Sequence, residues 1–259
     1  MPERAFLGKQ GSLLRMPGNQ LRFHLPPENR RGAEFFSRER DFCHRLREVL
    51  RRHPGDEIRV FAEGKEWLVE IVELQRDSFR GKILQEREIP PAFPWPVKLF
   101  VGLPRHPAKL ELLAEKATEL GVSALAPFPA ENSLPKKLTR AARLEKILLA
   151  AAEQSGRATV PQLAPAGSFQ EALATARGQI LLLDPKAAEA PFSSLSKKKE
   201  RAVGLAVFIG PEGGFSREEI SLAKAAGARI GGLGPAILKF ETAGIAALAQ
   251  LLGTASSDR

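Results

Sequence analysis

The sequence predicts an α/β protein, in which a parallel sheet covered by helices follows a small β domain. Three observations predict this fold class. From residue 97 onward, unbroken apolar runs alternate with amphipathic helices, which is typical of a parallel sheet buried on both faces. From 21 to 88 the segments are short, alternate in polarity and end at turns, which is typical of a small antiparallel barrel or sheet. A proline-dense stretch, 89–96, separates the two parts.

Composition narrows the possible partners and compartments. The 259 residues include 39 Lys and Arg against 30 Asp and Glu, a net charge of +9, which favours a polyanionic partner such as nucleic acid. A merely basic protein would fit the charge equally well. The one cysteine, Cys43, excludes an internal disulfide, and the four histidines lack ligand spacing, so we expect no metal site. Without a signal peptide or an apolar run of about 18 residues, we expect a cytoplasmic protein and no membrane contact.

The first ninety residues are expected to form an arm and then the β domain. Residues 1–20 are rich in glycine and polar groups without a sustained period, so we interpret them as an N-terminal arm. Residues 21–90 are assigned to the β domain. Its expected elements are strands at 58–62, 67–74 and 78–84 and a helix at 41–52, with Phe42, Leu46, Val49 and Leu50 at helical spacing.

This first part is rich in arginine. Residues 1–60 hold 12 Arg and 1 Lys against 8 acidic residues, which is over half of the chain's charge excess. Guanidinium groups bond phosphate oxygens bidentately and keep their charge, so Arg45, Arg47, Arg51 and Arg52 are candidate phosphate contacts. For any single arginine, pairing with a nearby acid on a solvated helix face is the simpler interpretation. For the cluster we favour RNA.

The connector and the segments after it define the second domain. The four prolines within 89–96 cannot donate to a sheet ladder, and Trp95 among them is expected to wedge between the domains. The expected strands are 97–101, 124–128, 180–183 and 229–233. The expected helices are one around 110–120 that ends at Gly121, one at 138–154, one capped by Ser168 and Glu171, and a last apolar one at 242–252.

The chain is organised around two glycine loops within 205–243. An apolar strand stops at the first loop, 210–214, and Ser216 with Glu219 has the spacing of a capping box at a helix start. A second short strand leads into Gly234-Pro235 and then the last helix. Ligands of parallel sheets bind beyond the carboxyl ends of the strands, where glycine lets main-chain groups approach a flat polar molecule. One such loop alone would be an ordinary tight turn, whereas the pair is more specific.

The residues of these loops carry a resemblance to a known family. GPEGGFSREE at 210–219 and LGPAILKFETA at 233–243 closely resemble the methyl-donor site of RsmE-type methyltransferases, SPOUT-class enzymes that methylate N3 of a uridine in 16S ribosomal RNA. KATELGV at 116–122 and EQSGR at 153–157 are similar to further motifs of that family. The pattern HxLxxVLR followed by GD, at 44–56, is similar to its N-terminal part.

Some residues depart from the family pattern. The second motif usually reads LGPRILRTETA, so Ala236 and Lys239 stand where arginines are expected, and Phe240 where threonine is. Asn132, in ENS at 131–133, replaces the arginine of the family's ERS.

The resemblance also implies an architecture and partners. It implies a PUA-like RNA-binding barrel over 21–90 and a SPOUT domain over 97–259, with a trefoil knot near 205–250 and a homodimer as the working unit. Its substrate would be 16S rRNA or the small ribosomal subunit, and its cofactor S-adenosyl-L-methionine. The RNA contacts that it implies are Arg22, Arg45, Arg47, Arg51, Arg52 and Lys116.

For the donor and the reaction, the resemblance implies a set of main-chain contacts and few side chains. The donor would be held by Leu183, Gly210, Glu212, Gly213, Gly214, Leu233, Gly234, Ile237, Leu238 and Thr242. A cation from Lys239 or Arg157 would favour the anionic uracil ring, and Glu241 or Glu212 would receive the N3 proton. Carboxylates beside glycine turns also serve simply as helix caps.

Two alternatives to uridine-N3 methylation stay open. The departures from the family pattern allow a related methyltransferase with a different RNA target, or a non-catalytic RNA-binding relative. Retention of both glycine loops argues against the second alternative. Dinucleotide and ATP sites are disfavoured, because the chain has no GxGxxG after its first strand and no GxxxxGK[ST].

Overall fold

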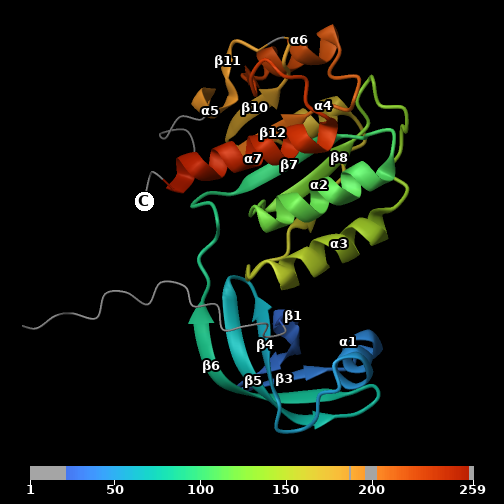
Figure 1. Ribbon diagram of the computed structural model, residues 1–259, viewed down its shortest axis with the longest axis vertical. Coiled ribbons are helices and arrows are strands. Elements are labelled where there is room, and N and C mark those ends of the chain that lie inside the picture. Colours follow the sequence, from blue (N-terminus) through green and yellow to red (C-terminus); the bar gives the residue numbers. More distant parts are fainter. Residues whose placement is uncertain (1–21, 187, 196–202, 257–259) are drawn as a thin grey trace, which may run out of the picture.

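The computed structural model describes residues 22–186, 188–195 and 203–256. The arm expected at 1–20 lies outside the described residues. A curled sheet, formed from the first part of the chain, and a larger α/β part are joined by the connector (Figure 1). The expected fold class is confirmed.

The first part is a mixed sheet. Its described strands are β1 (Arg22–His24), β2 (Arg30–Arg31), β3 (Glu34–Ser37), β4 (Glu57–Ala62), β5 (Lys65–Leu74) and β6 (Phe79–Glu88). They are hydrogen-bonded in the order β1-β4-β5-β6-β3-β2, with β1 parallel to β4 and the other pairs antiparallel. Within the described chain this sheet is curled but open, with β1 and β2 at its edges, rather than a barrel closed by strand pairing.

The helix expected at 41–52 differs in detail. It begins as α1 (Arg40–His44) and continues as a π-helical turn over Arg45–Val49, closed by the Leu50 N–H donating to the Arg45 carbonyl. A π turn shifts the residues after it around the helix axis. Leu46 is buried, whereas Val49, one of the apolar residues at helical spacing, is 64% exposed.

A buried carboxylate gathers arginines in this sheet. The Glu66 side chain, at the start of β5, is inaccessible to solvent. It accepts hydrogen bonds from Arg22 Nε at 2.6 Å, Arg59 at 2.9 Å and Arg87 Nε at 2.7 Å. Burial alone would raise the pKa of Glu66, but the arginines Arg22 and Arg87 lower it overall. This cluster joins β1, β4, β5 and β6 near the connector.

The second part is a parallel sheet. Its described strands are β7 (Val97–Gly102), β8 (Ala124–Phe128), β9 (Gln162–Leu163), β10 (Gln179–Leu183), β11 (Ala190–Pro191), β12 (Leu205–Ile209) and β13 (Arg229–Gly232). The order is β11-β13-β10-β12-β7-β8-β9, and every described pair is parallel. The long strands confirm the prediction to within one residue at either end, whereas β9 and β11 carry no sequence signal.

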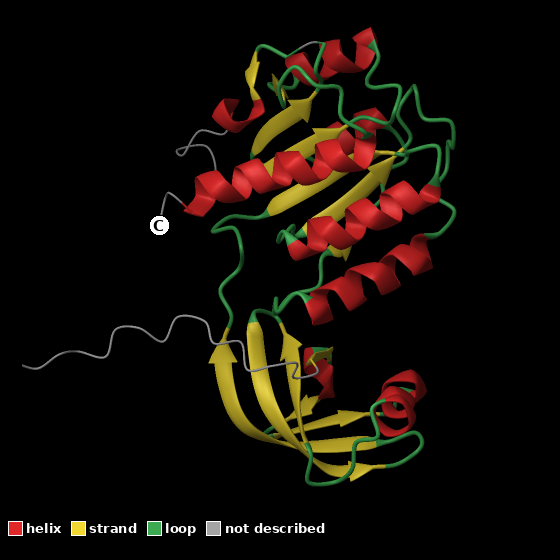
Figure 2. Cartoon of the chain, in the orientation of Figure 1, coloured by secondary structure: helices red, strands yellow, loops and turns green. Residues whose placement is uncertain are grey.

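Helices cover both faces of this sheet (Figure 2). They are α2 (Pro107–Glu119), α3 (Ala141–Gln154), α4 (Phe169–Thr175), α5 (Phe192–Leu195), α6 (Arg217–Ala225) and α7 (Phe240–Ser256). The Ser168 cap of α4 is confirmed, because its hydroxyl accepts from the Glu171 N–H. Helix α3 begins three residues later than expected and α7 is longer than expected at both ends. The α5 helix was not predicted.

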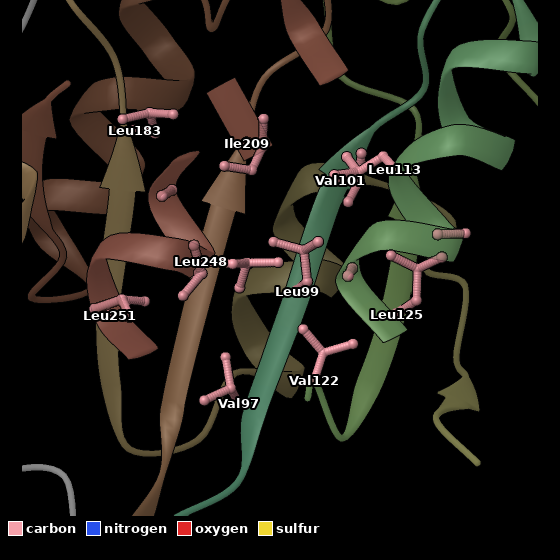
Figure 3. Packing of buried hydrophobic residues seen from close by; sticks show 14 of the residues in the cluster. Val97, Leu99, Val101, Leu113, Val122, Leu125, Leu183, Ile209, Leu248 and Leu251 are labelled. Atoms are coloured by element: carbon pink, nitrogen blue, oxygen red, sulfur yellow. The ribbon is translucent and has the colours of Figure 1, made fainter. Parts of the chain in front are cut away.

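Alternate residues of the strands enter different cores. Val97, Leu99 and Val101 of β7 point to one face, where Leu113 of α2 and Leu248 of α7 pack against them (Figure 3). The other face is aromatic and is covered by α4 and α6. Its stacked pair Phe100 and Phe208 lies 4.4 Å apart between ring centroids. The last helix therefore packs its buried apolar side chains against α2 and the sheet of the same chain. The trefoil knot stays a prediction.

The two parts of the chain are in contact. The Gly64 N–H donates to the Ala158 carbonyl, and Phe61 packs with Ala152 and Ala158 in a small core. Glu153 of α3 accepts from Arg45 at 2.6 Å and from the main-chain N–H of His24 at 3.3 Å. Trp95, expected to wedge between the domains, is partly buried against the core of the parallel-sheet part.

Candidate active site

The two glycine loops meet at one edge of the parallel sheet. Strand β10 lies between β12 and β13, so the loop after β12 and the loop after β13 flank the carboxyl end of β10. That end is Leu183, followed by the buried Asp184, whose N–H donates to the Gly231 carbonyl. The strand order thus brings three predicted segments of the site together at one point.

The first loop is compact and tightly packed. The Gly214 N–H donates to the Pro211 carbonyl at 2.8 Å, and Gly214 has a φ of +72°, which glycine adopts without strain. Pro211 lies against Gly102 at the end of β7, where a methyl group would come within 2.5 Å of the proline Cδ. The glycines are therefore required for the close approach of two main-chain segments.

The helix after this loop begins as predicted. The Ser216 hydroxyl accepts from the Glu219 N–H, and the Glu219 carboxylate accepts from the Ser216 N–H, which completes the capping box of α6. Glu219 is only 5% exposed, and its second oxygen accepts from the Glu131 N–H at 2.9 Å. This link to the loop after β8 was not predicted.

The side chain of Glu212, in the first loop, is held by the segment at the start of α2. Its carboxylate accepts from the Arg105 N–H at 3.0 Å and from Lys109 Nζ at 2.8 Å. Burial would raise the pKa of Glu212, but these hydrogen bonds lower it overall. A carboxylate engaged in this way is a poor proton acceptor, so these contacts do not favour the role expected for it at the uracil, which stays a prediction. Its main chain stays a candidate donor contact.

The second loop is more open. Gly234 has a φ of +116°, and the side chain of Ile237 is 95% exposed. The Lys239 carbonyl accepts from the Ala243 N–H at the start of α7, while the lysine residue itself is exposed. Phe240, where the family has threonine, is 5% exposed and belongs to the core under α7. This departure is a packing change, and Lys239 remains at the donor edge.

Two charged side chains border the second loop. Glu241, in the first turn of α7, has a buried Oε2 without a hydrogen-bond partner in the described part of the chain. Lys109, at the start of α2, has a raised pKa, first because of its hydrogen bond to Glu212 and to a smaller extent because of the charge of Glu241. Lys109 is therefore bonded to Glu212 and also lies within the electrostatic reach of Glu241. Sequence reasoning missed it, since nothing in its local pattern marks it.

Arg157 and Lys116 lie at the other edge of the sheet. The Arg157 guanidinium donates to the carbonyls of Thr118 and Val122, both at 2.7 Å, which places it where β8 begins. Burial lowers the pKa of Arg157 to about 10. Lys116 pairs with Glu115 and Glu119 along α2. In the described chain Arg157 holds the end of α2 rather than either glycine loop, and its role as the catalytic cation stays a prediction.

Most of the candidate RNA contacts already pair with acids. Arg22 is bound to Glu66, Arg47 pairs with its neighbour Glu48, and Arg45 pairs with Glu153. A fourth pair is Arg52 with Asp56 at 3.9 Å. Arg51 has a left-handed φ of 52° at the end of the π turn. The simpler interpretation therefore holds for the individual arginines, and the RNA surface stays a prediction for the cluster.

The described residues offer neither a metal site nor a membrane-spanning helix. Residues 22–186, 188–195 and 203–256 contain no group of three His, Cys, Asp or Glu side chains that could hold a metal ion. Of the helices described, none is long and apolar enough to cross a membrane.

Comparison with known proteins identifies the family. Residues 91–252 match the family model described as RNA methyltransferase domain. The chain belongs to this RNA methyltransferase family. It is 30% identical over 237 residues to the ribosomal RNA small subunit methyltransferase E of Bacillus subtilis, a match that covers 85% of this chain and 90% of the relative. The corresponding protein of Synechocystis is 32% identical over 213 residues, which cover 80% and 69% of the two chains.

A solved structure supports the same assignment across both parts of the chain. The ribosomal RNA small subunit methyltransferase E from Neisseria gonorrhoeae, bound to S-adenosyl methionine, superposes with a TM-score of 0.80 at 28% identity. The superposition covers 91% of this chain and 98% of that one. The curled sheet and the parallel sheet therefore both belong to the fold of this RNA methyltransferase family.

Proposed function

We propose that this protein methylates N3 of a uridine in the 16S rRNA of the small ribosomal subunit, with S-adenosyl-L-methionine as donor, as a cytoplasmic homodimer. The observation that carries the proposal is the meeting of the two glycine loops on either side of the carboxyl end of β10. The relatives named as small-subunit rRNA methyltransferases support the substrate, and the neighbour with bound S-adenosyl methionine supports the donor.

The loops fit a flat, polar donor. The main chain of Gly210–Gly214 and of 233–238 forms the two sides of the site, with Leu183 between them. The carboxylate of Glu212 is engaged by Lys109 and by the Arg105 N–H, so it is the main chain of this residue that we assign to the donor. When bound, S-adenosylmethionine supplies a methyl group already activated on its sulfonium, so the protein has to orient the donor and the base.

The charged residues at the second loop match what methylation of the uracil ring requires, a proton acceptor and positive charge. The N3 proton of uracil has to leave, and the ring then carries negative charge on its oxygens. We assign that proton to Glu241, and the absence of a hydrogen-bond partner for its buried Oε2 in the described chain supports this role. Lys109, which lies near Glu241, and Lys239 on the loop provide the positive charge that stabilises the anionic ring.

RNA binding is assigned to the first part of the chain, and dimerisation to the donor edge. The excess of arginine over acid in residues 1–60 favours contact with phosphates, with Arg45, Arg47, Arg51 and Arg52 as a group rather than singly. Ile237, 95% exposed on the second loop, is an apolar side chain that a second subunit would cover. Light scattering should report a dimer, and Ile237→Asp should shift it toward the monomer.

The decisive assay is methyl transfer from labelled S-adenosylmethionine to unmodified small subunits and to free 16S rRNA. The labelled nucleoside is identified by digestion and mass spectrometry. The proposal expects N3-methyluridine at a single site. Label on another base or another RNA would establish a different target. Donor binding without any transfer to these RNAs would contradict the assigned substrate, and no donor binding would leave the non-catalytic alternative.

A further inference from the structure

A third loop, the segment 130–136 after β8, supports the first glycine loop. It is held in one shape by its own polar groups. The buried Ser133 hydroxyl accepts from the Ala130 N–H at 3.1 Å. Lys136 Nζ donates to the carbonyls of Ala130 at 3.0 Å and Glu131 at 2.7 Å. These bonds fix the loop before it touches the donor site.

The buried carboxylate of Glu219 joins this loop to the first glycine loop. One oxygen accepts from the Glu131 N–H at 2.9 Å, and the other accepts from the Ser216 N–H at 3.0 Å. Both bonds are charge-assisted and the side chain is 5% exposed, so each is stronger than an exposed neutral bond. A helix cap needs only the bond from the Ser216 N–H. The bond from the Glu131 N–H ties together two loops whose residues are 88 apart in the sequence.

Asn132 completes the contact at the glycines themselves. Its Nδ2 donates to the carbonyls of Gly213 at 3.3 Å and Gly214 at 3.2 Å. A side chain at Gly213 would meet the Asn132 Cβ at 2.8 Å, so glycine is needed for this approach. A peptide unit is planar, so fixing the carbonyls of these glycines also fixes the directions of the N–H groups of Gly214 and Phe215.

We propose that Asn132 and Glu219 are positioning residues for the methyl donor, acting through the main chain of the first glycine loop. This inference rests on the proposed function. A loop made of glycines has many accessible conformations, and ordering it at the moment of binding would weaken affinity. The bonds from Asn132 and Glu219 order it beforehand. The resembled family often has ERS where this chain has Glu131-Asn132-Ser133, so Asn132 stands in the place of an arginine.

The test separates hydrogen bonding from packing at Asn132. Asn132→Asp keeps the shape of the side chain but replaces its hydrogen-bonding NH₂ group with a carboxylate oxygen that faces two carbonyls. Asn132→Ala removes both the hydrogen bonds and the packing of the side chain. The dissociation constant for S-adenosylmethionine is measured by calorimetry without RNA. We expect Asn132→Ala to weaken binding roughly 2-fold to 10-fold, the range for a lost hydrogen bond, and Asn132→Asp to weaken it further. A packing role predicts the reverse order.

Turnover and a matched control complete the experiment. With RNA, KM for the donor should rise in both Asn132 variants while kcat at saturating donor stays within about twofold. Glu219→Gln, which keeps the shape but can accept with one oxygen only, should raise the same KM. Asn29→Ala is the control, because Asn29 makes an equivalent side-chain bond, to the Phe36 carbonyl, in the first sheet.

The outcomes distinguish this inference from the proposed function. If the wild-type chain binds donor and Asn132→Asp binds it equally well, the positioning role is wrong while the proposed function stands. If the wild-type chain binds no donor, the proposed function fails and the inference fails with it. Asn132 is exposed, so its variants should melt at the wild-type temperature.

Discussion

Gly102 at the end of β7 lies directly against Pro211 of the first glycine loop. A methyl group on Gly102 would come within 2.5 Å of the Pro211 Cδ and 2.8 Å of its nitrogen. Because part of this contact is main chain, no change of side-chain rotamer can relieve it. The position of the first loop therefore depends on a glycine more than 100 residues earlier in the sequence.

Gly102→Ala should displace the first loop and weaken donor binding by at least about tenfold, because main-chain atoms have to shift to relieve the overlap. Calorimetry with S-adenosylmethionine measures the change. Gly253→Ala is the matched control, since a methyl group there meets nothing within 4 Å. Unchanged affinity in Gly102→Ala would show that the first loop does not contact the donor.

Glu241→Gln should lower kcat by about 10²-fold to 10⁴-fold, the usual contribution of a positioned general base, while donor affinity stays within about twofold. Single-turnover methyl transfer to RNA measures the chemical step. Glu218→Gln is the control, because it removes the same charge from an exposed position in the first turn of α6. Full turnover in Glu241→Gln would remove this carboxylate from the mechanism.

Glu66→Gln should destabilise the first sheet by roughly 3 kcal/mol, the lower end of the range for breaking a buried ion pair, because the buried Arg22 then loses its charged partner. Urea unfolding followed by fluorescence measures the change. Glu86→Gln removes a carboxylate from the neighbouring strand, where its side chain is 35% exposed, and should cost clearly less because solvent screens its ion pair. Equal costs for the two variants would contradict the role of burial.

The lowered pKa of Glu66 predicts a pH dependence of stability. A carboxyl group whose pKa is lower in the folded state contributes stability above its unfolded pKa, about 4.3, and this contribution is lost as pH falls through the folded pKa. The difference in unfolding free energy between wild type and Glu66→Gln should therefore be constant above about pH 5.5 and shrink at lower pH. A difference that grows on acidification would contradict the assigned direction.

Much of the fold follows from local pattern. The long strands of the parallel sheet are continuous apolar runs, and the caps of α4 and α6 follow from Ser168 and Ser216. Pattern could not give the π turn that exposes Val49, because local propensity does not distinguish α from π geometry over a few residues. The two-residue strands β9 and β11 are too short to carry any period.

The candidate site was predicted in part, for a similar reason. Glycines, capping residues and strand ends are local signals, so the two loops could be found from the sequence. The partners of Glu212, Glu219 and Asn132 lie 81 to 107 residues away, and only the strand order brings them together. Arg157 shows the converse, since a motif assigned it to the cleft while its described contacts are with Thr118 and Val122, before β8 begins.

In the proposed site both glycine loops contact one donor molecule. Hydrogen–deuterium exchange with and without S-adenosylmethionine measures this contact, with ATP as the control ligand that also contains adenosine. We expect slower exchange in peptides that contain 210–215 and in those that contain 233–238, with no change in 57–88. Protection of one loop alone, or of the first sheet instead, would contradict it.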